Sequence, residues 1–168
     1  MKDAIAVIAP KSCDCVSLAL NLNSLGDSFK GTEAFFRAIE KILKIPFFHF
    51  QETVAFSGQF VDVLESVSDC ARDFNRTCLL LAGGFLDQHV TTTALAALAK
   101  GLDVYLLNDV LICSQPKFEH LFLQRLAQAG SVHTTLAHCL FQWTLTSQDE
   151  SERKSVLRLA NGLTEIIN

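Results

Sequence analysis

Short apolar runs alternate with amphipathic segments along most of the chain. Runs of this length, bounded by turn residues, are typical of strands buried on both faces of a parallel sheet. Between them, apolar residues recur every three or four positions, which is the spacing of a helix with one buried face. The predicted strands are Ala4–Ala9, Pro46–Phe50, Thr77–Ala82, Val104–Leu107 and Ser131–Thr135. The predicted helices are Thr32–Lys44 with Thr32 as its cap, Gln59–Cys70, Val90–Lys100, Pro116–Ala129, Leu136–Leu145 and Ser151–Ile167.

This alternation of strands and helices predicts the α/β class. The expected architecture is a doubly wound, three-layer α/β/α Rossmann-like sandwich around a mostly parallel sheet of five or six strands. The segment Val16–Leu22 fits either a strand or a helical turn. No repeat or linker interrupts the pattern, so residues 1–168 are predicted to form a single domain. The predicted buried face of the helix 116–129 consists of Phe118, Leu121, Phe122 and Leu126.

The composition of the chain indicates which classes of partner the protein can bind. Apolar residues make up 49% of the chain and thirteen are Phe, which indicates either a deep core or apolar surface kept for subunit contacts. No apolar run is long enough for a membrane span, and the run before Pro10 is too short for a signal peptide. The net charge of −4 comes from interspersed acids and bases, which argues against nucleic acid. Most of the six cysteines lie in apolar periodicity, as expected of core thiols in the cytoplasm.

The segment Leu79–Asp109 carries the most information about function. An apolar run ends in Gly83-Gly84, a polar turn opens an Ala-rich helix, and Gly101 closes that helix before a second apolar run. In α/β folds, ligands bind beyond the carboxyl ends of the strands. The residues predicted to line a pocket there are Gly84, Phe85, Leu86, Asp87, His89 and Asp109.

This segment, together with the sequence QRLAQAG at 124–130, resembles the isochorismatase-like cysteine hydrolases, and most closely their compact bacterial branch. The resemblance implies an isochorismatase-like fold and a homo-oligomer. It also implies a thiolate nucleophile at the start of the helix, an Asp base at the end of the first strand and a Lys from mid-chain. Backbone N–H groups near a cis peptide, which would fall at residues 84–86, would stabilise the oxyanion.

The chain departs from this pattern at each of the three catalytic positions. The position of the base falls on Pro10, and the position of the thiol falls on His89. No Lys occurs between Thr53 and Thr77. These three changes predict a degenerate, catalytically inactive domain that persists as a homo-oligomeric scaffold or as a binder of a small molecule. No cofactor is expected.

Several alternatives remain open at this stage. His89 either acts as a base or anion ligand, or fills the volume of a disused pocket. Cys13 or Cys15, expected on the rim after the first strand, could serve as a relocated nucleophile with His89 as its base. The protein would then be a divergent cysteine hydrolase acting on an amide or ester of a small molecule. Otherwise the two cysteines are incidental loop residues.

The remaining candidate features are weaker. Asp109 either lines the pocket or caps the following turn. The helix Ala94–Ala99 packs either against another subunit or only within its own. No spacing of His or Cys residues predicts a metal site. The Gly83-Gly84 pair lacks the third glycine of a dinucleotide-binding fingerprint.

Overall fold

The computed structural model describes residues 15–20, 30–50, 58–73, 75–147 and 149–167. Within these ranges, parallel strands form one sheet in the order β2-β1-β3-β4-β5. The strands are β1 Cys15–Leu20, β2 Phe47–Phe50, β3 Cys78–Ala82, β4 Asp103–Leu107 and β5 Val132–Thr134. The helices are α1 Lys30–Leu43, α2 Gly58–Asp73, α3 Thr91–Ala99, α4 Glu119–Gln128, α5 Leu136–Thr146 and α6 Glu150–Ile167.

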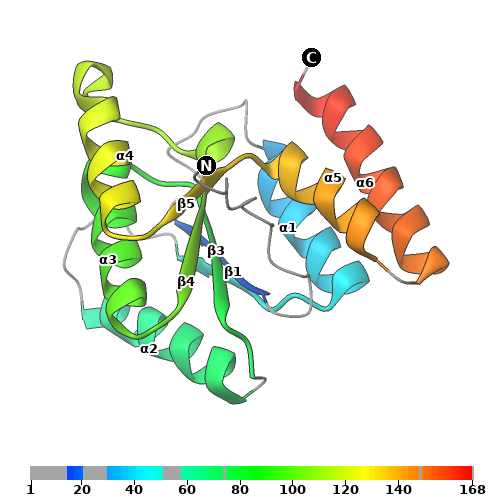
Figure 1. The fold of residues 1–168 in the computed structure, drawn as a ribbon, viewed down its shortest axis with the longest axis horizontal. Coiled ribbons are helices and arrows are strands. Elements are labelled where there is room, and N and C mark those ends of the chain that lie inside the picture. The colour runs from blue at the N-terminus through cyan, green and yellow to red at the C-terminus, as the bar shows by residue number, and fades with distance from the viewer. Residues whose placement is uncertain (1–14, 21–29, 51–57, 74, 148, 168) are drawn as a thin grey trace, which may run out of the picture.

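Helices cover both faces of this sheet (Figure 1). Leu80 and Ala82 of β3 point into a core shared with α1, α5 and α6, while Leu79 and Leu81 point into a core shared with α2, α3 and α4. Successive residues of a strand face opposite sides, so a strand buried on both sides must be apolar throughout. The predicted α/β arrangement of helices around a parallel sheet is confirmed. Within the described residues, no helix is both long and apolar enough to cross a membrane.

The N-terminal part of the sheet differs from the expectation. β1 lies between β2 and β3, so the segment that fitted either a strand or a helical turn is a strand from Cys15 to Leu20. The predicted strand Ala4–Ala9 lies outside the described residues. Helix α1 begins at Lys30, two residues before the predicted cap, so Thr32 is inside the helix. Helix ends are commonly misplaced by this much when they are judged from capping residues alone.

The predicted buried face of the helix 116–129 is wrong for two of its four residues. The helix consists of a 3₁₀ turn, Pro116–Phe118, followed by α4. Leu126 is buried, but Phe118 and Leu121 are exposed. Periodicity identifies residues that share one side of a helix, whereas burial requires another element to cover that side.

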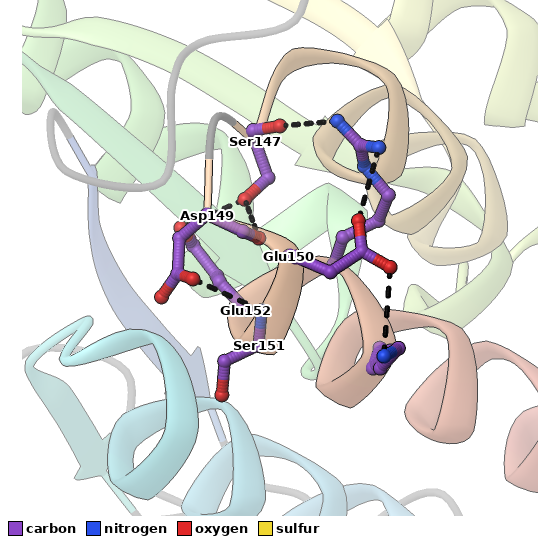
Figure 2. A network of polar contacts seen from close by, with 7 residues as sticks. Ser147, Asp149, Glu150, Ser151 and Glu152 are labelled. Atoms are coloured by element: carbon purple, nitrogen blue, oxygen red, sulfur yellow. Dashed lines mark hydrogen bonds and ion pairs between the residues drawn. The ribbon is translucent and has the colours of Figure 1, made fainter.

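Polar contacts fix the turn between α5 and α6 (Figure 2). The Ser147 hydroxyl donates to Glu152 Oε2 at 2.9 Å, and the N–H of Ser151 donates to Asp149 Oδ1 at 3.0 Å. Arg153 Nη2 donates to the Ser147 carbonyl at 2.9 Å. Side-chain acceptors at the start of a helix satisfy N–H groups that have no partner within the helix. α6 therefore returns alongside α5 over the same face of the sheet (Figure 1).

Candidate functional site

The candidate site begins at the two glycines that follow β3. Gly83 and Gly84 have φ values of 69° and 73°, a left-handed conformation that residues with a side chain rarely adopt. This turn directs the chain alongside the loop that follows β4. Gly83 N–H donates to the Val110 carbonyl at 2.7 Å, and Ile112 N–H donates to the Gly84 carbonyl at 3.1 Å. The structure therefore brings the predicted loops after β3 and β4 together at the carboxyl edge of the sheet.

A kinked turn connects this loop to α3. Sequence analysis predicted a helix beginning at Val90, but the turn Leu86–Val90 precedes α3, and Gln88 within it has non-helical φ and ψ values of −128° and −106°. Threonine hydroxyls bond carbonyls of this turn: Thr91 donates to the Leu86 carbonyl at 2.5 Å, and Thr93 to the His89 carbonyl at 2.7 Å. The peptide bonds here are trans, so the cis bond implied by the resemblance is absent from residues 84–86.

His89 lies inside this turn and is buried. Only 5% of its surface is exposed, and the neighbouring Leu86 and Val90 are buried in the core shared with α3. A helix start that binds an anion or activates a nucleophile presents its groups to the ligand. The burial of His89 thus favours its role in filling volume over a role as an exposed base. Leu86, predicted to line a pocket, is a core residue instead.

Asp87 holds the loop that follows β4. Its carboxylate accepts a hydrogen bond from the Ser114 N–H at 3.1 Å and another from the Ser114 hydroxyl. Burial raises the pKa of Asp87, but the bonds from Ser114 outweigh it and hold the pKa below its ordinary value. The carboxylate is therefore ionised and occupied by the protein's own donors.

Asp109 is the second carboxylate at this edge, and it also binds backbone. Both of its oxygens lie 3.0 Å from the N–H of Leu136, the first residue of α5. Burial raises the pKa of Asp109 above its ordinary value, against the opposing effect of these hydrogen bonds. Of the two roles predicted for Asp109, the structure shows the capping role. However, the capped element is a helix 27 residues further along the chain rather than the following turn.

The structure places Cys15 away from the candidate site. Cys15 is the first residue of β1, is fully buried, and pairs in register with Cys78 at the start of β3. The strands are parallel, so Cys15 lies at the amino edge of the sheet while His89 follows the carboxyl edge. The length of β3 separates these edges, about 13 Å at the rise of a strand. Cys13 and Pro10 lie outside the described residues.

Two further thiols lie near the carboxyl edge. Cys113 is buried, and its Sγ donates to the Gln115 carbonyl at 3.3 Å. Burial raises the pKa of Cys139 to about 11, which keeps this thiol protonated at neutral pH. Both thiols are enclosed by the protein at this edge. In the described part of the chain, no group of three His, Cys, Asp or Glu side chains is placed to hold a metal ion.

Sequence reasoning missed the partners that occupy the site. Ser114 donates to Asp87, Leu136 donates to Asp109, and Thr91 and Thr93 donate to carbonyls of the turn Leu86–Val90. The three consecutive threonines after Val90 were a usable signal, because threonine inside a helix bonds carbonyls of the preceding turn. The side-chain oxygen of Asn108 was also missed. It is buried, and no described residue donates a hydrogen bond to it.

The chain shares its fold with solved isochorismatase-like hydrolases, as the resemblance predicted. The chain is similar to YcaC from Pseudomonas aeruginosa, solved with hexane-2,5-diol and covalent acrylamide, at 16% identity and a TM-score of 0.66, covering 95% of this chain and 97% of that one. It is similar to MAR1 ribonuclease from Caenorhabditis elegans at 17% identity and a TM-score of 0.62, covering 89% and 91%.

Two other solved structures share the fold. One is the Escherichia coli YcaC gene product, an octameric hydrolase of unknown specificity, at 15% identity and a TM-score of 0.57 over 94% and 97% of the two chains. The other is an isochorismatase-like hydrolase from Alkaliphilus metalliredigens, at 14% identity and a TM-score of 0.52 over 79% and 97%. No family model and no curated protein matches the chain. At these identities the likeness establishes the fold and not the activity.

Proposed function

We propose that this chain is a catalytically inactive isochorismatase-like domain that acts in the cytoplasm as a homo-oligomeric scaffold or as a binder of a small molecule. The burial of His89 carries the proposal. This residue stands where the resemblance places the nucleophilic thiol, and only 5% of its surface is exposed. Acyl transfer requires a nucleophile whose reacting atom meets the substrate carbonyl. A side chain so enclosed does not present one.

The carboxylates at the same edge give further support. A nucleophile is activated by a neighbouring base whose lone pairs are available. Here Asp87 accepts two hydrogen bonds from Ser114, and Asp109 accepts from Leu136. Both carboxylates therefore bind donors of the protein itself. Asp87 holds the loop after β4 in place, and Asp109 holds the start of α5.

Turnover of small esters and amides tests the loss of catalysis. We expect the wild-type chain and the His89→Ala variant to match the buffer rate. The His89→Cys variant, which restores a thiol at the family's position, is also expected to be inactive because base and cation are still missing. Turnover by the wild type that disappears in His89→Ala would contradict the proposal. Turnover gained in His89→Cys would show that the rest of the machinery survives.

Exposed apolar side chains on α5 and α6 support the oligomeric part of the proposal. Phe141 and Leu145 lie one turn apart on α5 and are 60% and 67% exposed, and Leu157 of α6 is 44% exposed. Side chains of this size are depleted on the surface of monomers and enriched at interfaces. By contrast, Ala94 and Ala97 of α3 are buried within the subunit. The α5–α6 surface is therefore our candidate interface between copies.

Sedimentation measurements test this interface. The Phe141→Glu/Leu145→Glu double variant should dissociate an assembly that the wild type forms, because two charges would be buried at the contact. Leu121→Glu on α4 is the matched control, since Leu121 is also exposed but lies on the opposite face of the sheet. A monomeric wild type would refute the scaffold. Equal dissociation by the control would refute the choice of surface.

A further inference from the structure

The amino edge of the sheet, opposite the candidate site, carries a pair of cysteines. Cys15 begins β1 and Cys78 begins β3, and the two are register partners on adjacent parallel strands. Neighbouring strands lie about 4.8 Å apart. This spacing falls within the Cα separation of disulfides, about 4.4–6.8 Å. The backbone therefore places the two residues at bridging distance.

The two thiols also share one face of the sheet. Side chains of register partners lie on the same side, and both cysteines belong to the core that packs against α1 and α5. Tyr105 of β4 lies close to the same thiols. Burial raises the pKa of its phenol to about 12, and the charges of Cys78 and Cys15 contribute to that rise. Both cysteines are thiols in this structure.

Neighbouring residues hold the pair at the surface end of the two strands. Arg76 Nη1 donates to the Cys15 carbonyl at 2.7 Å, and Arg76 Nη2 donates to the Lys44 carbonyl at 2.9 Å. These two bonds join Arg76, which precedes β3, to the first residue of β1 and to the segment before β2. The hydroxyl of Thr77 lies 3.5 Å from Cys78 Sγ, and Thr77 itself is exposed. Cys78 is buried, but the residue that precedes it in the chain is exposed to solvent.

We propose that Cys15 and Cys78 form a redox modification site that closes to a cross-strand disulfide when a small hydroperoxide reaches it. The Cys78 thiolate attacks one peroxide oxygen, the O–O bond breaks, and the leaving hydroxide takes up the proton released by Cys78. The resulting sulfenic acid is attacked by the Cys15 sulfur. An S–S bond forms, the S–O bond breaks, and the oxygen leaves as water with the Cys15 proton. Hydrogen peroxide is reduced to two waters as two thiols are oxidised.

Closure of this bridge would restrain the unfolded chain. It would link the adjacent strands β1 and β3 across about 60 residues of sequence, a loop length at which disulfides substantially stabilise proteins. We expect the thermal midpoint of the oxidised protein to rise by about 5 °C, reversibly on reduction. Oligomerisation and ligand binding at the carboxyl edge do not enter this inference, so it stands or falls independently of the proposed function.

The test is peptide mapping of the intact chain after treatment with hydrogen peroxide, without reduction. The expected product is a peptide pair linked through Cys15 and Cys78 that is lost after reduction. A Cys70→Ser variant is the control and should form the same bridge, since Cys70 lies on α2, which packs on the opposite face of the sheet from the pair. Cys15→Ser and Cys78→Ser should each abolish the bridge and the rise in midpoint.

Three outcomes of the mapping would overturn the proposal, and all can be read in the wild type even if a variant fails to fold. One is the absence of thiol loss at peroxide levels that oxidise a surface thiol. Another is oxidation of Cys78 to the sulfinic acid without a bridge. The third is a bridge that uses Cys13 or Cys139 in place of either member of the pair.

Discussion

Replacing Asp109 with alanine should lower the free energy of unfolding by about 1.5 kcal/mol. Both carboxylate oxygens lie 3.0 Å from the N–H of Leu136. Because Leu136 is 2% exposed, water has little access to that N–H once the carboxylate is gone. A hydrogen bond to a charged acceptor is worth about 1.5–3 kcal/mol, and loss of a helix cap about 1 kcal/mol. The residue Asp109 as a whole is exposed although its carboxylate is partly enclosed, which places the expected loss near the lower bound.

The Asp109→Asn variant separates the hydrogen bond from the charge. Asparagine keeps one acceptor oxygen, and the raised pKa of Asp109 shows that burial disfavours its ionised form in the folded protein. The stability that a raised carboxyl pKa contributes is present at low pH and is lost as pH rises through the folded value. A neutral amide avoids this loss at pH 7. We therefore expect Asp109→Asn to cost about 0.5 kcal/mol or less.

Urea unfolding followed by tryptophan fluorescence measures both variants. The single tryptophan, Trp143, is buried in α5, the helix that Asp109 caps. Asp103→Ala is the matched control, because Asp103 is an exposed carboxylate on β4, and its loss should change stability by less than about 0.5 kcal/mol. Unchanged stability in Asp109→Ala would refute the capping role. Equal losses in the alanine and asparagine variants would show that charge, not the acceptor, matters.

Further predictions concern the rest of the edge and the core. The lowered pKa of Asp87 implies stability that is present above its ordinary value of 3.8 and lost as pH falls through the folded value, so the deficit of Asp87→Asn in urea unfolding should disappear in acid. Thr93→Val should cost about 1 kcal/mol by the same measurement, because the buried hydrogen bond from the Thr93 hydroxyl to the His89 carbonyl is lost. Leu81→Ala, in the strand buried on both faces, should cost about 3 kcal/mol. An unchanged midpoint for any of these variants would show that the assigned contact does not stabilise the fold.

The sequence predicted those parts of the fold that depend on local pattern. β3 was identifiable because a strand covered on both faces must be apolar at every position, and α2, α5 and α6 because their apolar residues recur at helical spacing. The first strand was ambiguous since Ser17 interrupts its apolar run. That serine is buried in the sheet, with its hydroxyl bonded to the Pro46 carbonyl at 3.0 Å. The partner 29 residues away cannot be read from local sequence.

The sequence predicted which loops meet at the carboxyl edge but not the contacts of their side chains. The Gly-Gly turn and the strand ends indicated that the loops after β3 and β4 lie together, because glycine is the residue that readily adopts the positive φ this turn requires. Asp109 binds the first N–H of α5, which lies 27 residues further along the chain. The position of Cys15 at the amino edge depends on where β1 begins. Exposure of Phe118 and Leu121 likewise depends on which neighbouring element covers α4. Each of these is a property of tertiary packing.

Whether the domain is catalytically inactive can be measured by incubating the full chain with an activated acyl ester, followed by intact-mass analysis and peptide mapping. Covalent catalysis at the carboxyl edge would leave an acyl group on His89 or on a thiol there. We expect no adduct on residues 83–114 beyond that formed by the urea-unfolded protein. A stoichiometric adduct on folded His89, absent from His89→Ala, would refute the proposed loss of catalysis and identify the protein as an active acyl-transfer enzyme.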